Sequence, residues 1–176
     1  NTTTINYTFG SGVVVEGAGF LLNDEMDDFS AKAGVANVFG AIGGTANEIQ
    51  PKKRMLSSMS PTIMLKDGKV SLVTGSPGGT TIITSVYQSI LNVVEFQMDV
   101  QQAVNEPRFH HQLWPKDQIE HYPGLNEDVL KSLQAMGYTT AEYSFGDLQL
   151  ISNVNGELEA ASEQGKGNRG VSIVID

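Results

Sequence analysis

The chain has 176 residues, enough for a single domain with a sizeable core, and 40% of them are hydrophobic. Its 20 Asp and Glu against 11 Lys and Arg give a net charge of −9, which disfavours binding to nucleic acid. The absence of cysteine excludes disulfides, and no apolar run approaches the roughly 20 residues of a membrane span. We expect one domain over residues 1–176.

The first part of the chain is predicted to form short strands and a long loop. Residues 1–7 are rich in threonine and favour β structure, and the apolar runs 13–15 and 20–22 are typical of short strands. Residues 31–55 have little periodicity and predict a surface loop of a length that is usually functional or mobile. Strands over 62–66 and 70–74 flank Asp67-Gly68, a strong hairpin signal.

Helices are predicted in the middle of the chain and strands at its end. Residues 80–96 are predicted to form a helix with one apolar face, which consists of Ile82, Ile83, Val86, Ile90, Leu91 and Val94. A weaker helix covers about 99–104, and a third runs from the N-cap Asn126 to Gly137. Closing strands are expected over 148–153, 158–161 and 170–175, the first two joined near Asn155-Gly156. This order of elements predicts an α+β layered fold.

Residues 75–79 (Gly-Ser-Pro-Gly-Gly) lie between a predicted strand and the best predicted helix. Two consecutive glycines let backbone N–H groups approach a ligand closely, and a helix N-terminus favours negative charge. The segment therefore suits a carboxylate or a developing oxyanion, although a simple strand-to-helix turn explains the same residues. A Walker A loop is excluded because no Gly-Lys-Ser/Thr follows.

Residues 56–60 (Leu-Ser-Ser-Met-Ser) place three hydroxyl groups before a strand. Such hydroxyls can donate hydrogen bonds to a carboxylate or phosphate, and a plain polar loop is the alternative. No Gly-x-Ser-x-Gly sequence surrounds them, so none is expected to be a triad nucleophile.

The three histidines are not predicted to bind metal. His110 and His111 are adjacent, and side chains alternate in direction along an extended segment, while His-x-x-x-His spacing is absent. We interpret residues 107–112 (Pro-Arg-Phe-His-His-Gln) as structural.

Residues 23–30 (Asn-Asp-Glu-Met-Asp-Asp-Phe-Ser) hold four carboxylates within five positions. Such crowding is unfavourable unless a cation lies among the charges. The stretch does not fit an EF-hand, because the phase is wrong and no glycine follows. Two carboxylates, Glu25 and Asp28, would suffice to hold an ammonium group, and a solvated acidic turn is the alternative.

Five stretches, in this order, carry a resemblance to a known family. They are residues 4–12 (TINYTFGSG), 21–29 (LLNDEMDDF), 53–62 (KRMLSSMSPT), 75–79 (GSPGG) and 107–112 (PRFHHQ). The series is collinear, covers nearly the whole chain and strongly resembles the small subunit of γ-glutamyltranspeptidase (glutathione hydrolase).

The resemblance implies a four-layer αββα sandwich of the N-terminal-nucleophile hydrolase type. In that family a precursor cleaves itself into a large and a small subunit, and the new N-terminal threonine attacks a γ-glutamyl amide with its own amine as base. The glutamyl group then passes to water or an acceptor amine. The resemblance further implies a heterodimer, no cofactor and a periplasmic, extracellular or cell-surface location.

Individual roles follow from the same resemblance. Glu25 and Asp28, helped by Asn6, are expected to hold the substrate α-ammonium. Ser57 and Ser58 are expected to bind its α-carboxylate, beside an arginine from the large subunit. The N–H groups of Gly78 and Gly79 are expected to form the oxyanion hole. Thr4 is expected to support the nucleophile by hydrogen bonding.

One feature departs from the family pattern. The family's nucleophile lies well before the motif that begins at Thr4, on a strand of its own, whereas three residues precede Thr4 here. Thr2 and Thr3 are not N-terminal and match strand threonines. We therefore expect the nucleophile to lie outside the given residues and the 176-residue chain alone to be inactive.

Other functions stay open from the sequence. The family includes relatives that process poly-γ-glutamate or act as acylases, and retention of both the acidic and the serine pair favours a free γ-glutamyl head group. A non-catalytic, calcium-binding β-rich module and a family member that lost its nucleophile are further alternatives.

Overall fold

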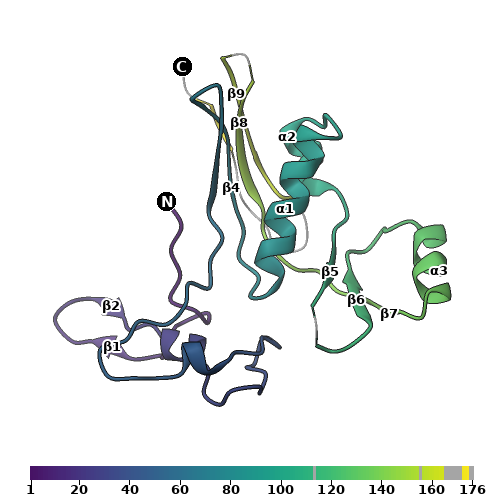
Figure 1. Ribbon diagram of the computed structural model, residues 1–176. Coiled ribbons are helices and arrows are strands. Elements are labelled where there is room, and N and C mark those ends of the chain that lie inside the picture. The colour runs from purple at the N-terminus through teal and green to yellow at the C-terminus, as the bar shows by residue number, and fades with distance from the viewer. Residues whose placement is uncertain (113, 155, 165–171, 175–176) are drawn as a thin grey trace. The chain divides into compact units, whose positions relative to one another are not determined.

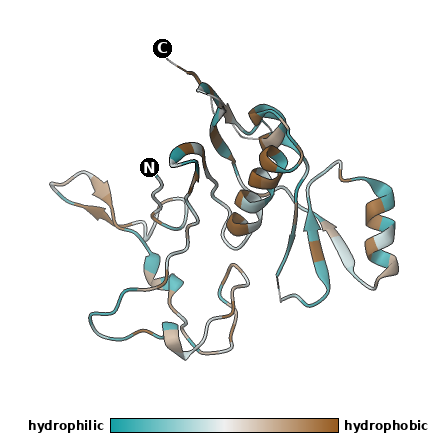
Figure 2. Cartoon of the chain, turned by 45° about the horizontal axis from the view of Figure 1, so that its top comes forward, coloured by the Kyte–Doolittle hydropathy of each residue, from teal (hydrophilic) through white to brown (hydrophobic). Residues whose placement is uncertain are grey.

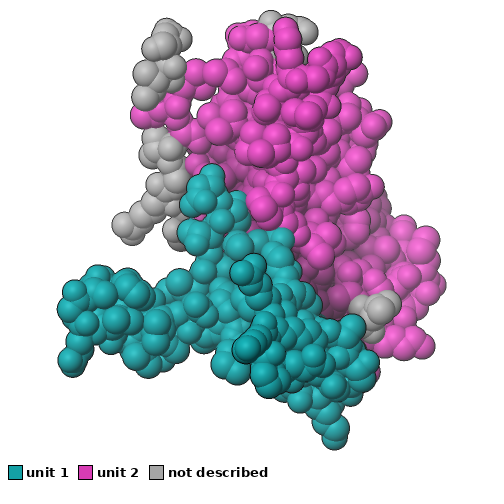
Figure 3. Space-filling model, turned by 60° about the vertical axis from the view of Figure 1, so that its left-hand side comes forward, with its two compact units in different colours: residues 1–59 teal, residues 60–176 magenta. Residues whose placement is uncertain are grey.

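The computed structural model describes residues 1–112, 114–154, 156–164 and 172–174. The chain divides into two compact units, residues 1–59 and residues 60–176, which Figure 3 shows in separate colours. Each unit has its own secondary structure. The single domain expected from the chain length stays a prediction.

The first unit consists of short elements and loops. Strands β1 (Val14–Val15) and β2 (Phe20–Leu21) form the predicted antiparallel pair. Two 3₁₀ helices follow, η1 (Glu25–Asp28) and η2 (Thr45–Asn47), the second within the predicted long loop. Residues 1–7 form no strand, contrary to their β propensity. A strand needs a partner for its backbone groups, and no described segment pairs with these residues.

The second unit is built on a four-stranded antiparallel sheet (Figure 1). Its strands are β3 (Thr62–Lys66), β4 (Lys69–Gly75), β8 (Gln149–Val154) and β9 (Glu157–Ser162), in the order β3-β4-β8-β9. The predicted hairpin joins β3 to β4 through Asp67 (φ 53°) and Gly68 (φ 78°). Two successive residues with positive φ match the twist of antiparallel strands, which is why Asp-Gly occurs at this position.

Two helices cover one face of this sheet. Helix α1 (Thr81–Val94) and helix α2 (Val100–Asn105) match the first two predicted helices, and the Asp99 side chain accepts a hydrogen bond from Gln102 N at the start of α2. The buried core between the helices and the sheet consists of Leu72, Val100, Val104, Leu148, Leu150 and Ala161. On the opposite face of the sheet, Ile63 and Ile151 remain exposed.

Helix α1 buries a different stripe from the one that its apolar residues predict. Ile82 and Val86 are buried as expected, but Ile83 and Val94 are 66% and 50% exposed. Ser85 and Ser89 are completely buried instead. Small side chains allow a helix to lie close to a sheet, which explains why serines and not larger apolar residues face the sheet here. Apolar residues lie on more than one side of α1 in Figure 2.

A smaller sheet, which the sequence did not predict, forms the rest of the second unit. Strands β5 (Phe109–His111), β6 (Gln118–His121) and β7 (Thr139–Glu142) pair in the order β5-β6-β7. The parallel strands β6 and β7 are connected through α3 (Glu127–Ala135). As predicted, Asn126 caps this helix, with its Oδ1 accepting from Asp128 N, and Gly137 (φ 98°) follows its end.

The α+β class expected from the sequence is confirmed: the four-stranded sheet is antiparallel, and α1 and α2 cover one of its faces. Strands β8 and β9 confirm the first two closing strands. The third, over residues 170–175, falls largely outside the described residues, as does Asn155 of the expected turn; residues 172–174 are not in a strand. None of the described helices is long and apolar enough to cross a membrane.

Candidate active site

The acidic pair lies on η1 in the first unit. In a 3₁₀ helix, residues three positions apart lie above one another, so Glu25 and Asp28 share one side of the helix. Both are buried, at 9% and 8% exposure, whereas Met26 between them is 65% exposed. The spacing of the two acids in the sequence therefore places both carboxylates on the inner side of one short helix.

These two carboxylates lack a cationic partner within the described residues. Glu25 Oε1 and Asp28 Oδ2 are buried and accept no hydrogen bond, and neither residue is in an ion pair. Burial, a hydrogen bond to Asp28 and the charges of Asp28 and Asp24 raise the pKa of Glu25 from 4.5 to about 7. A bound cation would offset this repulsion. Among the described residues, no group of three or more His, Cys, Asp or Glu side chains is placed to hold a metal ion.

The other two acids of the stretch are held by Tyr7. Its backbone N–H donates to Asp24 Oδ1 at 3.3 Å, and its hydroxyl donates to Asp27 Oδ2 at 2.9 Å. Asp27 is exposed and Asp24 half-buried. Tyr7 thus ties these two acids to the segment that precedes β1.

Thr4 and Asn6 are linked to each other in a tight turn. Asn6 N donates to Thr4 Oγ1 at 2.8 Å, and Asn6 adopts a positive φ of 75°, which asparagine tolerates better than most residues. Asn6 Nδ2 is buried without a hydrogen-bond partner. A buried amide donor without an acceptor is unfavourable, and a ligand oxygen or an additional protein group would satisfy it.

A pocket of about 550 Å³ brings several of the predicted residues together within the first unit. It is lined by Thr3, Thr4, Glu25, Arg54, Met55, Leu56, Ser57, Ser58 and Met59. Asp28 and Asn6 do not line it, but Asp28 interacts directly with Glu25. The Ser57 hydroxyl makes long contacts of 3.3 Å with Met59 N and O, and no hydrogen bond of the described residues involves the Ser58 hydroxyl. Both hydroxyls are thus available to a ligand.

Arg54 is a charged residue of the pocket for which no role was predicted. It is exposed and forms no ion pair within the described residues. Its position three residues before Ser57 was visible in the sequence, but nothing in the local pattern indicated that its side chain reaches the same pocket as Glu25. The pocket therefore carries one cation as well as carboxylate and hydroxyl groups.

Gly78 and Gly79 form the turn from β4 into α1 in the second unit. Their φ angles are 136° and 57°, values that favour glycine, and a Cβ on Gly78 would lie 2.4 Å from Thr81 Oγ1. Their carbonyls accept hydrogen bonds from Thr81 N and Ile82 N. No hydrogen bond of the described residues uses the two glycine N–H groups, which leaves them available to an anionic oxygen.

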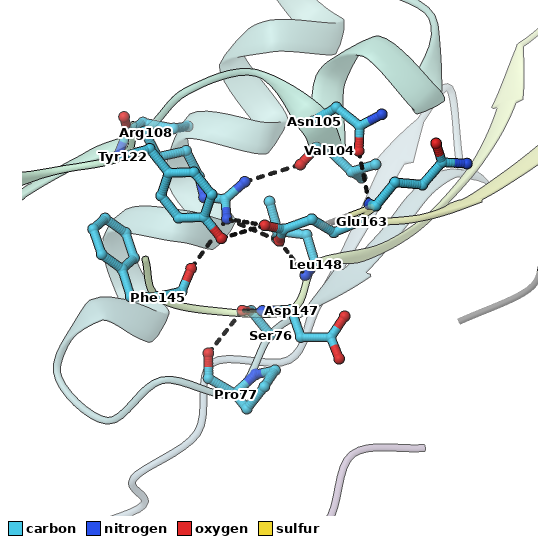
Figure 4. A network of polar contacts seen from close by, with 12 residues as sticks. Ser76, Pro77, Val104, Asn105, Arg108, Tyr122, Phe145, Asp147, Leu148 and Glu163 are labelled. Carbon is cyan, nitrogen blue, oxygen red and sulfur yellow. Dashed lines mark hydrogen bonds and ion pairs between the residues drawn. The ribbon is translucent and has the colours of Figure 1, made fainter. Parts of the chain in front are cut away.

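A buried network lies behind this turn (Figure 4). Ser76 Oγ accepts from Asp147 N at 3.1 Å and donates to Pro77 O at 2.8 Å, which ties the glycine turn to the segment before β8. The neighbouring Glu163 accepts from Leu148 N at 2.9 Å. The turn is thereby connected to the end of β9.

Arg108 completes the network. It is 1% exposed, pairs with both Glu163 oxygens at 2.8 Å and lies 4.5 Å from the centre of the Tyr122 ring. Tyr122 donates its hydroxyl to Glu163, and burial followed by that contact raises the pKa of Tyr122 to about 12. Residues 107–112 thus have the structural role interpreted from the sequence. His110 is buried and His111 exposed, as alternation predicts.

Comparison with known proteins places these features in a family. The family model described as Gamma-glutamyltranspeptidase matches residues 1–173. Over 99% of its length the chain is 54% identical to a glutathione hydrolase proenzyme of Pseudomonas aeruginosa, and over 92% it is 51% identical to one of Escherichia coli. It spans only 32% and 28% of these two relatives, about a third of their length.

A solved structure of similar chain length also matches. It is a γ-glutamyltranspeptidase from Pseudomonas nitroreducens in complex with L-DON, with a TM-score of 0.92 and 53% identity, covering 100% of this chain and 92% of the solved one. The family match, the sequence identities and the shared fold lead to one conclusion: the chain belongs to the γ-glutamyltranspeptidase family.

Proposed function

We propose that this chain is the small-subunit part of an enzyme that cleaves the γ-glutamyl amide of glutathione and related compounds. The reaction passes through a γ-glutamyl-enzyme, and the glutamyl group is transferred to water or to an amino acid or peptide acceptor. The matched relatives are named glutathione hydrolase proenzymes, which supports this activity and processing of a precursor.

The observation that carries the proposal is the buried acidic pair beside the serine pair. Glu25 lines the same pocket as Ser57 and Ser58, and the pair has buried oxygens without partners. A γ-glutamyl group ends in an α-ammonium and an α-carboxylate on one carbon atom. Its ammonium complements Glu25 and Asp28, and its carboxylate complements the serine hydroxyls. Asn6 Nδ2 is a further buried donor, without an acceptor among the described residues.

Acyl transfer needs two further components. The N–H groups of Gly78 and Gly79 are suited to stabilise the oxyanion of the tetrahedral intermediate. The nucleophile is a threonine whose free amine takes up its hydroxyl proton as the hydroxyl oxygen attacks the γ-carbonyl carbon. The amine of the substrate leaves with a proton, and water or an acceptor amine then releases the glutamyl group. Thr4 Oγ1 already accepts from Asn6 N, and its hydroxyl hydrogen can support that threonine.

The large subunit of the same precursor is the proposed partner. The face of the four-stranded sheet opposite α1 and α2 exposes Ile63 and Ile151, aligned across strands through Val73. A sheet with one helix-covered face and one apolar open face is half of a four-layer αββα sandwich, and a second sheet from the large subunit would complete it. That subunit would also supply an arginine for the α-carboxylate. An exported or cell-surface location goes with this proposal.

The test uses the two-subunit protein produced from its full coding sequence. It should release p-nitroaniline from γ-glutamyl-p-nitroanilide and turn over glutaryl-p-nitroanilide, which lacks the ammonium, much more slowly. Equal rates would refute the ammonium site and favour an acylase. Absence of turnover of both compounds by the processed protein would refute the enzymatic function, and a melting temperature that rises with calcium would then favour a binding module.

A further inference from the structure

Asn47, at the end of η2, uses both ends of its side-chain amide in hydrogen bonds between separate segments of the first unit. Its Nδ2 donates to the backbone oxygen of Asp28 at 2.7 Å, and its Oδ1 accepts from Leu56 N at 3.1 Å. Its backbone oxygen accepts from Ser30 N at 2.9 Å. One residue thus contacts the end of η1 on one side and the segment of residues 55–58 on the other.

These partners are adjacent to the proposed substrate-binding groups. Asp28 belongs to the acidic pair, and Leu56 directly precedes Ser57 and Ser58. The side chain of Asn47 therefore bonds directly to both the segment that carries the carboxylates and the segment that carries the hydroxyls.

Neighbouring contacts fix η2 in place. Lys53 Nζ donates to the carbonyls of Ala46 and Glu48, at 2.6 and 3.0 Å, on either side of Asn47. On the other side, Gly43 approaches Ser30 so closely that a Cβ would lie 2.0 Å from Ser30 Oγ. These contacts hold the backbone around η2, so the Asn47 side chain keeps a fixed position between its two partners.

The geometry of the substrate makes this bridge important. The ammonium and carboxylate of an α-amino acid are attached to the same carbon, so their separation is fixed by covalent bonds. A rigid ligand with two charged ends binds well only if both receptors have the matching separation, and an error of about 1 Å is costly. We propose that Asn47 is a positioning residue that sets the acidic pair at the right distance from the serine pair, and thereby selects a free α-amino acid head group. This inference rests on the proposed function.

The experiment compares Asn47→Ala with wild type in the processed two-subunit enzyme. KM for γ-glutamyl-p-nitroanilide should rise about tenfold, the effect of one or two lost hydrogen bonds, with a smaller change in kcat. KM for glutaryl-p-nitroanilide should change less, because that compound does not use the acidic pair. An equal loss for both substrates would mean that Asn47 is merely structural and would overturn the proposal.

Asn47→Asp keeps the shape and the acceptor for Leu56 N but loses the donor to Asp28 O, and it serves if Asn47→Ala does not fold. A negative charge by itself would attract the ammonium and lower KM. A raised KM for the γ-glutamyl substrate would therefore identify loss of the donor, whereas an unchanged or lowered KM would overturn the bridge.

Asn126→Ala is the matched control. It removes a side-chain hydrogen bond of similar length, 2.8 Å to Asp128 N, at the start of α3 in the second unit. It should lower stability without altering the ratio of the two KM values. A changed ratio in this control would contradict a specific role for Asn47.

Hydrogen exchange separates this inference from the proposed function. The Leu56 amide should be protected in the wild-type enzyme and exchange several-fold faster in Asn47→Ala. If wild type turned over neither substrate, the proposed function would fail while this measurement would still test the bridge. Equal exchange at Leu56 in both proteins would refute the bridge itself.

Discussion

Glu25 and Asp28 lie three residues apart on one 3₁₀ helix, and each keeps a buried carboxylate oxygen without a hydrogen-bond donor. Burial, a hydrogen bond to Asp28 and the charges of Asp28 and Asp24 raise the pKa of Glu25 to about 7, and a bound cation would offset this cost. Sites that are unfavourable when empty and balanced when occupied are typical of ligand binding rather than of folding.

Asp28→Asn should raise KM for γ-glutamyl substrates by about 10–100-fold, because a charged contact to the ammonium contributes about 1.5–3 kcal/mol. The amide keeps the size of the carboxylate, and the free energy of unfolding should not fall, because repulsion with Glu25 is relieved. Steady-state kinetics and thermal unfolding check the two effects. Asp27→Asn, which alters an exposed acid of the same turn, is the control and should leave KM within about threefold. Equal effects of the two variants would contradict the assignment.

The pH dependence of KM should report the ionisation of Glu25. Below about pH 7 the acidic pair holds a proton and binds an ammonium weakly, so KM for the γ-glutamyl substrate should fall as pH rises through that value. In Glu25→Gln this step should disappear, while KM stays high throughout. A wild-type KM that is flat between pH 5.5 and 8 would refute the raised pKa.

The same pKa has the opposite consequence for stability. The folded chain binds the Glu25 proton more tightly than the unfolded chain, since the pKa is raised from 4.5 to about 7. The contribution of this group to stability is therefore fully present below about pH 4.5 and is lost as pH rises toward 7. The difference in melting temperature between wild type and Glu25→Gln, measured along this range, checks the sign. A stabilising contribution that grows with pH would contradict it.

The sequence predicted those features whose cause is local. The Asp67-Gly68 hairpin and the cap at Asn126 depend on a few neighbouring residues, and each is present as expected. The resemblance supplied residue roles for Glu25 and Asp28 that periodicity alone left open between a ligand site and a solvated turn.

The features that the sequence did not predict depend on distant partners. Strands β5, β6 and β7 are only three or four residues long, too short to leave a clear local pattern, so pairing between remote segments determines them. Glu163 meets Arg108 from 55 positions away, and no local pattern indicates this contact. The two links of Asn47 were hidden for the same reason, since they reach 19 and 9 residues along the chain.

Gly78→Ala should lower kcat by about 100-fold or more, the typical cost of losing an oxyanion donor. The added Cβ would meet Thr81 Oγ1 at 2.4 Å, and φ of 136° is unfavourable for alanine, so the turn and its N–H groups must move. Gly137→Ala is the control: it too has a positive φ, 98°, but open space around the added Cβ. It should lose stability and keep kcat. Similar kcat values for both variants would contradict an oxyanion role for the turn.

Arg108 and Glu163 are 1% and 3% exposed, and Glu163 also accepts from Leu148 N, so removal of its charge leaves a guanidinium without compensation. Glu163→Gln should lower the free energy of unfolding by about 3–5 kcal/mol. Denaturant unfolding followed by fluorescence, or calorimetry, measures this change. Glu127→Gln, which breaks an exposed ion pair with Lys131 at 3.7 Å, should cost less than about 0.5 kcal/mol.

The same Glu163→Gln substitution should also affect catalysis. Because Leu148 lies next to Asp147, whose N–H donates to Ser76, loss of the Glu163 charge should lower kcat more than it raises KM. A destabilised variant with unchanged kcat would mean that the network supports the fold but does not position the glycine turn.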